Sequence, residues 1–152
     1  MAVSLALYQP DIPQNTGAIL RLCACMDTDL HIIEPCGFVL DDRRLRRAGM
    51  DYADLARMTR HRSWQAFLDA AVCRRLLLMT TQGATAYSAI SYQDGDCLLF
   101  GRESAGVPQD VHHQADLRLR IPMAGGRRSI NVANAAAMVL GEALRQTGGF
   151  PA

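Results

Sequence analysis

The sequence contains no lysine. All 16 basic residues are arginine, and 15 acidic residues offset them, so the formal net charge is only +1. Without lysine there is no phosphate-binding loop of the Walker type, no Schiff-base lysine and no anchor for pyridoxal phosphate. A net charge this close to zero also gives no overall positive field of the kind that attracts polyanions.

Signals for secretion and membrane insertion are missing as well. The N-terminus has no basic start, its apolar run is too short for a signal peptide, and no apolar stretch reaches the roughly 18 residues of a membrane helix. The cysteine count is odd and includes no CxxC pair, which argues against a disulfide framework or a zinc ribbon. We therefore expect a cytoplasmic protein, without membrane contact, in which these cysteines are free thiols: Cys23, Cys25, Cys36, Cys73 and Cys97.

Short apolar runs alternate with helical patterns along the chain. Hydrophobic residues make up 49% of the 152 residues, enough for one domain over residues 1–152. Strands are expected at residues 3–8, 30–34, 55–59, 76–80, 97–100 and 117–121, and helices at 16–26, 42–48, 63–71 and 131–146. This order predicts an α/β fold, with a mostly parallel sheet and helices on both faces.

Polar loops that contain glycine follow three of the predicted strands, at residues 10–17, 101–108 and 122–129. Ligands of open α/β sheets bind outside the carboxyl ends of the strands, so these loops are the candidate site. In the first loop we expect Asn15 to cap a helix that carries Gly17 and Arg21 on one face. The free N–H groups at this helix start suit an anion, although an ordinary capped turn also explains the loop.

The second loop directly follows a buried strand, and its glycines permit a tight turn and close approach to a ligand. It resembles the nucleophile elbow of serine hydrolases, but Arg102 stands where that motif requires glycine. None of the four histidines is an obvious partner for a nucleophilic serine, and the chain has no GxGxxG. A serine hydrolase and an ordinary dinucleotide-binding enzyme are therefore disfavoured.

The third loop leads into the last predicted helix, which either Ser129 or Asn131 is expected to cap. Asn134 falls inside this helix, where asparagine is a poor choice. We interpret it as a buried amide that needs a ligand or a backbone loop as its hydrogen-bond partner.

Arginines cluster at two places, residues 43–47 and residues 57–62. Helical spacing places Arg43, Arg46 and Arg47 on one side, which suits a nucleic-acid phosphate backbone. A solvated helix face remains the alternative, because nearby aspartates partly neutralise the first cluster. His112 and His113 are adjacent, but no third ligand has a matching spacing, so no metal site is expected.

Taken together, the loops form an ordered set of motifs. They read PDIPQNTGAILRLC (10–23), LLFGRESAGVP (98–108) and RIPMAGGRRSINVANA (120–135), and LHIIEPCGF (30–38), DDRRLRRAGMDY (41–52) and SYQDGD (91–96) accompany them. Over nearly its whole length the chain resembles the SPOUT class of RNA methyltransferases. Within that class it is similar to the tRNA (cytidine(34)-2'-O)-methyltransferase family.

The resemblance implies a C-terminal trefoil knot and S-adenosylmethionine as the cofactor without a metal. It also implies a homodimer with the first and last helices at its interface and each active site built from both chains. It implies 2'-O-methylation of the wobble nucleotide 34, a cytidine or a modified uridine, in the anticodon stem-loop of leucine tRNA. Three alternatives remain open. They are methylation at another tRNA position, a non-catalytic RNA-binding homologue, and a small α/β enzyme that acts on a soluble nucleotide.

The same resemblance implies roles for particular residues. Those implied to bind the cofactor are Thr80, Phe100, Gly101, Ile121, Met123 and Ser129. Those implied to act in catalysis or to position the substrate are Asn15, Arg21, Glu103 and Asn131, and those implied to contact RNA are Asp41, Arg43 and Arg46. A guanidinium keeps its proton at neutral pH, so we expect Arg21 to stabilise the developing alkoxide as a cation rather than to act as a base.

The chain departs from the family pattern at Gly141, where close relatives tend to carry an aromatic residue before the helix glutamate, here Glu142. The segment between Pro108 and Leu117 is also slightly shorter. No appended RNA-binding domain is expected, so the dimer surface itself would hold the RNA.

Overall fold

The computed structural model describes residues 1–126 and 129–152. Arg127 and Arg128 of the third motif lie outside the described residues. The described chain forms one sheet of seven strands in the order β3-β2-β1-β6-β4-β7-β5, and all neighbouring strands run parallel. The strands are β1 (Ser4–Tyr8), β2 (Leu30–Ile33), β3 (Met58–His61), β4 (Arg75–Met79), β5 (Thr85–Ala86), β6 (Asp96–Phe100) and β7 (Leu117–Arg120).

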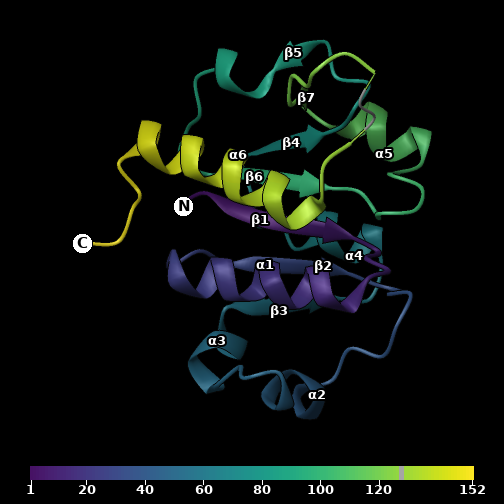
Figure 1. The fold of residues 1–152 in the computed structure, drawn as a ribbon, viewed down its shortest axis with the longest axis vertical. Helices are drawn as coiled ribbons and strands as arrows, with labels where there is room; N and C mark the ends of the chain where they lie inside the picture. Colours follow the sequence, from purple (N-terminus) through teal and green to yellow (C-terminus); the bar gives the residue numbers. More distant parts are fainter. Residues whose placement is uncertain (127–128) are drawn as a thin grey trace.

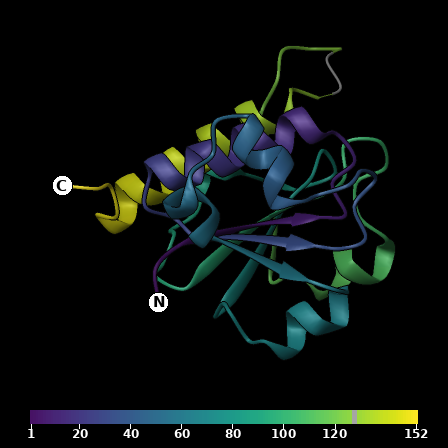
Figure 2. The ribbon, with the colours of Figure 1, turned by 90° about the horizontal axis from the view of Figure 1, so that it is seen from below.

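Helices cover both faces of this sheet, as Figures 1 and 2 show. They are α1 (Pro13–Cys25), α2 (Asp42–Arg47), α3 (Tyr52–Ala56), α4 (Trp64–Asp69), α5 (Gln109–Gln114) and α6 (Val132–Thr147), with a short 3-10 turn, η1 (Tyr87–Ala89). Helices α1 and α6 lie side by side over one face, and α4 and α5 lie on the other. The predicted α/β class, with a parallel sheet between two helical layers, is therefore confirmed.

The two layers explain why the central strands are mostly apolar on both sides. In β1, Leu5 and Leu7 join the core cluster under α1 and α6, whereas Ala6 and Tyr8 join the cluster under α4 and α5. Successive side chains of a strand point to opposite faces. Because both faces are covered, a central strand has no polar side, and β1, β2 and β6 are buried at every residue.

The strand expected at residues 55–59 was placed too early. Asp51 and Asp54 form a capping box, in which each side chain accepts a hydrogen bond from the other's backbone N–H, and this box starts helix α3. Leu55 and Ala56 therefore end a helix, and β3 begins at Met58. The apolar run predicted a strand correctly, but it placed the strand two to three residues before its true position.

The start of α1 also differs from the prediction. Pro13 occupies the first helical position, Ile12 is the N-cap, and no side chain caps this helix. Asn15 is therefore not a cap but lies in the first turn, where its amide is free for other contacts. The cap expected at Asn131 is confirmed, because Asn131 accepts at the start of α6. Helix α4 is capped by Ser63, which accepts from the Ala66 N–H.

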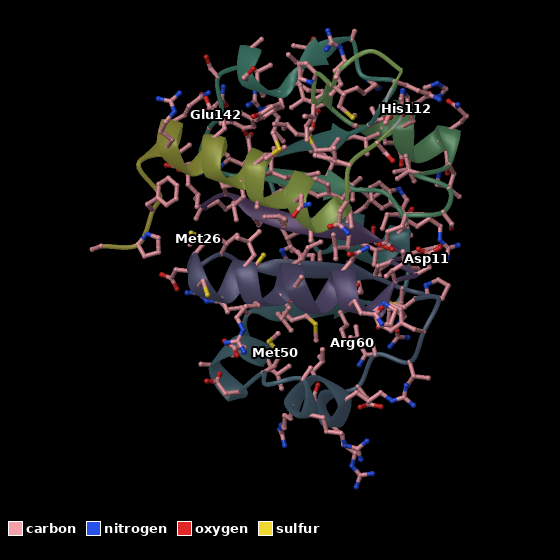
Figure 3. The ribbon with its side chains drawn as sticks, in the orientation of Figure 1. Asp11, Met26, Met50, Arg60, His112 and Glu142 are labelled. Carbon is pink, nitrogen blue, oxygen red and sulfur yellow. The ribbon has the colours of Figure 1, made fainter. Side chains whose placement is uncertain are left out.

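The order of the strands places the loops at a switch point. From β1 the chain moves outward to β2 and β3, then crosses to β4 on the other side of β6. Crevices at such reversals hold ligands in open α/β sheets. Asp11, just after β1, lies at this carboxyl edge, and Glu142, late in α6, lies toward the other end of the molecule (Figure 3). Within the described ranges, no helix is long and apolar enough to cross a membrane, and all five cysteines are free thiols.

Candidate active site

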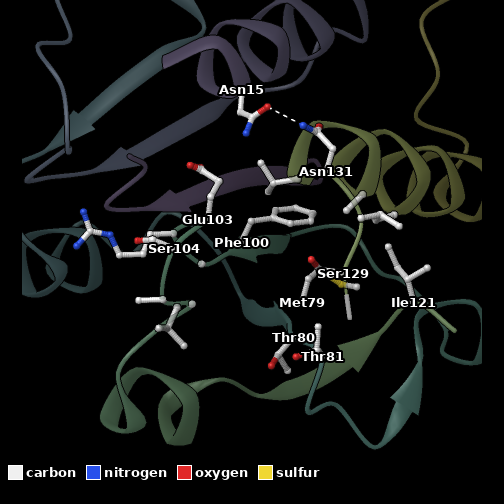
Figure 4. A pocket seen from close by; sticks show the side chains of 18 of the residues that line it. Asn15, Met79, Thr80, Thr81, Phe100, Glu103, Ser104, Ile121, Ser129 and Asn131 are labelled. Carbon is white, nitrogen blue, oxygen red and sulfur yellow. Dashed lines mark hydrogen bonds between the residues drawn. The ribbon is translucent and has the colours of Figure 1, made fainter. Parts of the chain in front are cut away.

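A cavity of about 610 Å³ opens at the carboxyl edge of the sheet. Its walls are the segments that follow β4, β6 and β7, together with the first turns of α1 and α6 (Figure 4). Its volume is in the range of pockets that bury a small organic ligand or cofactor. The three loops singled out by their glycines therefore meet around one cavity.

The structure places every residue implied to bind a cofactor along this cavity: Thr80, Phe100, Gly101, Ile121, Met123 and Ser129. Phe100 is buried at the end of β6 and supplies an aromatic wall. Thr80 follows β4, and its backbone N–H is held by the Leu119 carbonyl at 2.8 Å. These residues are far apart in the sequence, and the parallel strands bring them together.

Gly101 stands where only glycine fits. A Cβ there would lie 2.6 Å from the carbonyl carbon of Gly106, and Arg102 and Gly106 pair as a single β-bridge that closes the loop. Gly106 itself has a φ of +66°, in the region that favours glycine. The loop after β6 is thus a tight turn, and at Gly101 and Gly106 it borders the cavity with backbone alone.

Two asparagines meet across the cavity wall. The Asn131 side-chain oxygen accepts from the backbone N–H of Ala133 and Asn134, at 2.8 and 3.3 Å. Its Nδ2 donates to the Asn15 Oδ1 at 2.9 Å, which turns the Asn15 NH2 group toward the cavity (Figure 4). Because a capping oxygen must accept, the orientation of both amides is fixed. The pair offers N–H donors to a ligand.

Glu103 lines the cavity but uses its carboxylate on the protein. Oε2 accepts from the backbone N–H of Ile12 at 2.9 Å and of Asp11 at 3.3 Å. Burial is the main cause that raises the pKa of Glu103, and a side-chain hydrogen bond to Asp11 adds to it. The geometry therefore favours Glu103 as a group that holds the first loop in place.

Arg21 does not line the cavity of its own chain. Its Nη2 donates to the Gly49 carbonyl at 2.7 Å, and its Nη1 lies 3.5 Å from Asp54 Oδ2. The side chain is 49% exposed on the side of α1 that faces α2 and α3. A single chain thus brings Asn15, Glu103 and Asn131 together and leaves Arg21 apart from them.

The residues implied to contact RNA lie on or beside α2, away from the cavity. Asp41 is the N-cap of this helix, because its Oδ1 accepts from the Arg44 backbone N–H at 2.7 Å. Its carboxylate also lies 3.6 Å from the Arg44 guanidinium, so capping accounts for this residue without RNA. Arg43 and Arg46 are exposed on α2.

Two further expectations meet the structure. Asn134 is exposed in the first turn of α6, so its interpretation as a buried amide was wrong. Its backbone N–H donates to the capping oxygen of Asn131, and its side chain is exposed. Gly141 lies in α6 with open space where a Cβ would stand, so its surroundings do not require glycine.

The sequence arguments missed three residues beside the cavity: Asp11, Arg102 and Ser104. Ser104 Oγ donates to Asp11 Oδ2, and Arg102 Nε lies 3.7 Å from the same oxygen. The loops at 10–17 and 101–108 had been singled out, but Asp11 and Ser104 were given no role in them, and Arg102 was considered only as a departure from the nucleophile-elbow motif. Complementary charges at equivalent strand-end positions were the available signal. Among the described residues, no group of three or more histidine, cysteine, aspartate or glutamate side chains is arranged to hold a metal ion.

The parallel sheet and the cavity enclosed by its strand-end loops are those of an open α/β protein that binds a ligand at the carboxyl edge of its sheet. The chain belongs to the SpoU rRNA Methylase family, whose model matches residues 2–141. It is 55% identical to the tRNA (cytidine(34)-2'-O)-methyltransferase of Ancylobacter novellus, over 99% of this chain and 96% of that one.

Solved structures agree with the family assignment. A structure from work on the 2-OH methylation of C/U34 on tRNA has a TM-score of 0.86 and 39% identity, and the match covers 95% of each chain. The SpoU methyltransferase AviRb from Streptomyces viridochromogenes, in complex with AdoMet, has a TM-score of 0.80 and 26% identity over 95% of this chain and 57% of that one. The expected SPOUT fold, with its C-terminal knot, is confirmed at this level.

Proposed function

We propose that this protein transfers a methyl group from S-adenosylmethionine to the ribose 2'-OH of nucleotide 34 of tRNA. One observation carries the proposal. Six residues implied to bind the cofactor line a single cavity, in a chain that is 55% identical over 99% of its length to a tRNA (cytidine(34)-2'-O)-methyltransferase. We also propose that the protein acts in the cytoplasm, where tRNA is modified.

The residues around the cavity suit S-adenosylmethionine. Phe100, Val107 and Ile121 provide apolar and aromatic walls for an adenine ring, and the tight turn at Gly101 exposes backbone groups beside them. Thr80 and Ser129 add hydroxyl groups on the same wall. When bound, the cofactor supplies an electrophilic methyl group on a sulfonium, and no metal is needed for that chemistry.

The side chains then have separate tasks. The Asn15 NH2 group points into the cavity, where it can donate to an oxygen of the substrate or the cofactor. Transfer to a hydroxyl develops negative charge on the ribose oxygen as its proton leaves, and a fixed cation stabilises that charge. We assign this task to Arg21 of the partner subunit, because the family resemblance implies an active site built from both chains and Arg21 is absent from the cavity of its own chain.

A homodimer that packs α1 and α6 against a second copy would supply that arginine. These helices lie side by side on one face of the molecule. Met138 of α6 is 43% exposed there, and Arg21 on α1 is half exposed. The family resemblance implies a subunit contact at these two helices, and Met138 lies exposed on one of them.

The anticodon stem-loop is proposed to lie along α2. Arg43 and Arg47 are exposed on this six-residue helix, which Asp41 caps and Leu45 anchors in the core. Arginine side chains on a fixed backbone suit phosphate oxygens, and such contacts position an RNA without reading its sequence.

The proposal is tested by incubating the protein with methyl-labelled S-adenosylmethionine and total tRNA from cells that lack the modification. We expect label in the tRNA, located by nuclease mapping and mass spectrometry at the ribose of nucleotide 34. EDTA should not reduce the transfer, since no metal takes part.

Two results would contradict the proposal. One is the absence of label in tRNA from a protein that binds S-adenosylhomocysteine, which would leave a non-catalytic homologue. The other is label confined to a different nucleotide, which would keep the chemistry and overturn the substrate position.

A further inference from the structure

Asp11 connects two loops that are far apart in the sequence. It lies between β1 and α1, and its Oδ2 accepts a hydrogen bond from Ser104 Oγ in the loop after β6. The Arg102 guanidinium lies against the same oxygen, with Nε at 3.7 Å. The hydrogen bond from Ser104 is the main cause that lowers the pKa of Asp11, so this carboxylate is ionised at neutral pH.

Glu103, which lies between Arg102 and Ser104, holds the backbone of the first loop. Glu103 Oε2 accepts from the N–H groups of Asp11 and Ile12. Three consecutive residues, Arg102, Glu103 and Ser104, thus hold two consecutive residues, Asp11 and Ile12. We call these five residues the loop clamp.

A third segment supports Asp11 from behind. The Gly37 N–H donates to the Pro10 carbonyl at 2.9 Å, and a Cβ at Gly37 would lie only 2.6 Å from the Asp11 Cβ. Glycine at this position lets the segment after β2 press directly against Asp11. The side chain of Asp11 is therefore 19% exposed, in a loop that has no regular secondary structure.

The clamp joins two walls of the cavity. On one side, Ile12 and Asn15 line the cavity, and on the other every residue from Gly101 to Val107 does so. A change in the distance between the loops would change the shape of the cavity and the place of the Asn15 amide. The clamp itself contributes little to the apolar core, because its contacts are polar and lie at the edge of the sheet.

Two of its atoms are buried without a hydrogen-bond partner in the part of the chain that the structure describes. They are Asp11 Oδ1 and Arg102 Nε. A buried polar atom without a partner lowers stability, and such atoms are concentrated where function requires a particular arrangement. The clamp is therefore not an arrangement that stability alone would favour.

We propose that Asp11 is a positioning residue, which holds the 101–106 loop against the start of α1 and so keeps the cavity shaped for the cofactor. The effect on methyl transfer rests on the proposed function, whereas the effect on loop geometry does not. The cofactor would bind the clamped arrangement, so the bound enzyme would have its loops in place even without Asp11. Loss of Asp11 should therefore weaken cofactor binding more than it slows methyl transfer by the bound enzyme.

The test compares four variants with the wild type. Asp11→Ala removes both side-chain links, Arg102→Ala/Ser104→Ala removes them from the other side, and a triple variant combines the changes. Asp94→Ala is the matched control, because Asp94 is an exposed aspartate in the turn before β6, outside the cavity lining. S-adenosylhomocysteine affinity is measured by calorimetry, and stability is measured by thermal unfolding. KM for S-adenosylmethionine and kcat are measured in the methyl-transfer assay with tRNA.

If Asp11→Ala leaves the clamped arrangement populated at one part in ten, the apparent affinity falls about tenfold. The double variant should lose the same amount and the triple variant no more, because the three residues act through one contact. KM should rise with kcat changed by less than about threefold. The melting temperature of the ligand-free protein should stay within a few degrees of the wild type.

Wild-type affinity in Asp11→Ala would overturn the proposal. So would a loss of affinity that only follows a large fall in melting temperature, or losses that add in the triple variant, since each points to a merely structural role. Should the wild type itself not bind S-adenosylhomocysteine, the proposed function fails instead. The clamp is then judged by amide exchange at Ile12 and residues 101–106, which Asp11→Ala must accelerate at least about tenfold.

Discussion

Asn131 shows how one side chain can determine what another presents to a ligand. Its oxygen is committed to the start of α6, and its nitrogen is therefore committed to Asn15. Asn15 in turn has only its NH2 group left for the cavity. On this geometry Asn131 acts through Asn15, and the donor that faces the ligand belongs to Asn15.

Asn131→Asp should reverse this arrangement without harming the fold. Aspartate caps a helix about as well as asparagine, so the free energy of unfolding should change by less than about 0.5 kcal/mol. A carboxylate only accepts, however, so Asn15 must turn its NH2 group toward residue 131 and its oxygen toward the cavity. Methyl transfer should fall by about 10²-fold, as expected for loss of a fixed donor.

The matched control is Ser63→Asp, which exchanges one capping residue for another at α4, on the opposite face of the sheet. It should leave methyl transfer unchanged, with thermal unfolding and initial rates measured for both variants. Full activity in Asn131→Asp would show that the direction of the Asn15 amide does not matter.

At the scale of elements, β2 and β3 are joined by a buried histidine pair. His31 Nδ1 and His61 Nε2 lie 3.0 Å apart beside Phe67, under α4. One ring must donate and the other accept, so the accepting ring is neutral. Burial lowers the pKa of His31 from 6.5 to about 4, and burial also lowers the pKa of His61.

This pair should make stability depend on pH. Unfolded imidazole binds a proton near pH 6.5 and folded His31 only near pH 4, so its stabilising contribution is complete above pH 6.5 and is lost as pH falls toward 4. Between pH 7.5 and 5.0 the wild type should lose about 2 kcal/mol more than His31→Gln in urea unfolding. His113→Gln, at an exposed histidine, should behave like the wild type, and an equal loss in His31→Gln would contradict the assignment.

Local sequence signals located most elements, and their failures have physical causes. Residues 55–59 were read as a strand because they are partly apolar, although the Asp51–Asp54 capping box just before them marks a helix start. Asn15 was read as a cap because asparagine favours caps, but Pro13 already fixes the first helical position. In both cases two local signals predicted different structures. The capping box decided the first case, and the proline decided the second.

At the scale of the whole molecule, the sequence indicated which loops form the site but not how they touch. The parallel sheet brings every strand-end loop to one edge, so the cavity itself was predictable from alternating strands and helices. The contact between Asn15 and Asn131 spans 116 positions, and the Asp11 clamp spans 92 and 93 positions. Such contacts depend on the order of strands in the sheet, which local patterns do not encode.

The position of Arg21 is also a property of the whole molecule. In one chain it is held by Gly49 and Asp54, apart from the cavity. Our central claim is that a complete active site combines the cavity of one chain with Arg21 of the partner subunit. Arg21→Ala should then abolish most methyl transfer and leave S-adenosylhomocysteine affinity nearly unchanged. Arg21→Lys should lose on the order of 10²-fold, because it keeps the charge without the planar fork.

The most direct test is complementation between two inactive chains. The two variants are Arg21→Ala and Ile121→Trp, whose larger side chain would fill the cavity. They are expressed together with different tags, and methyl transfer to tRNA is measured on the purified mixed dimer. One intact cavity then faces one intact Arg21, so the mixed dimer should recover about half of the wild-type rate, since one of its two sites is complete. If the mixed dimer is no more active than the two parent proteins, or if an active protein is monomeric, the shared active site is contradicted.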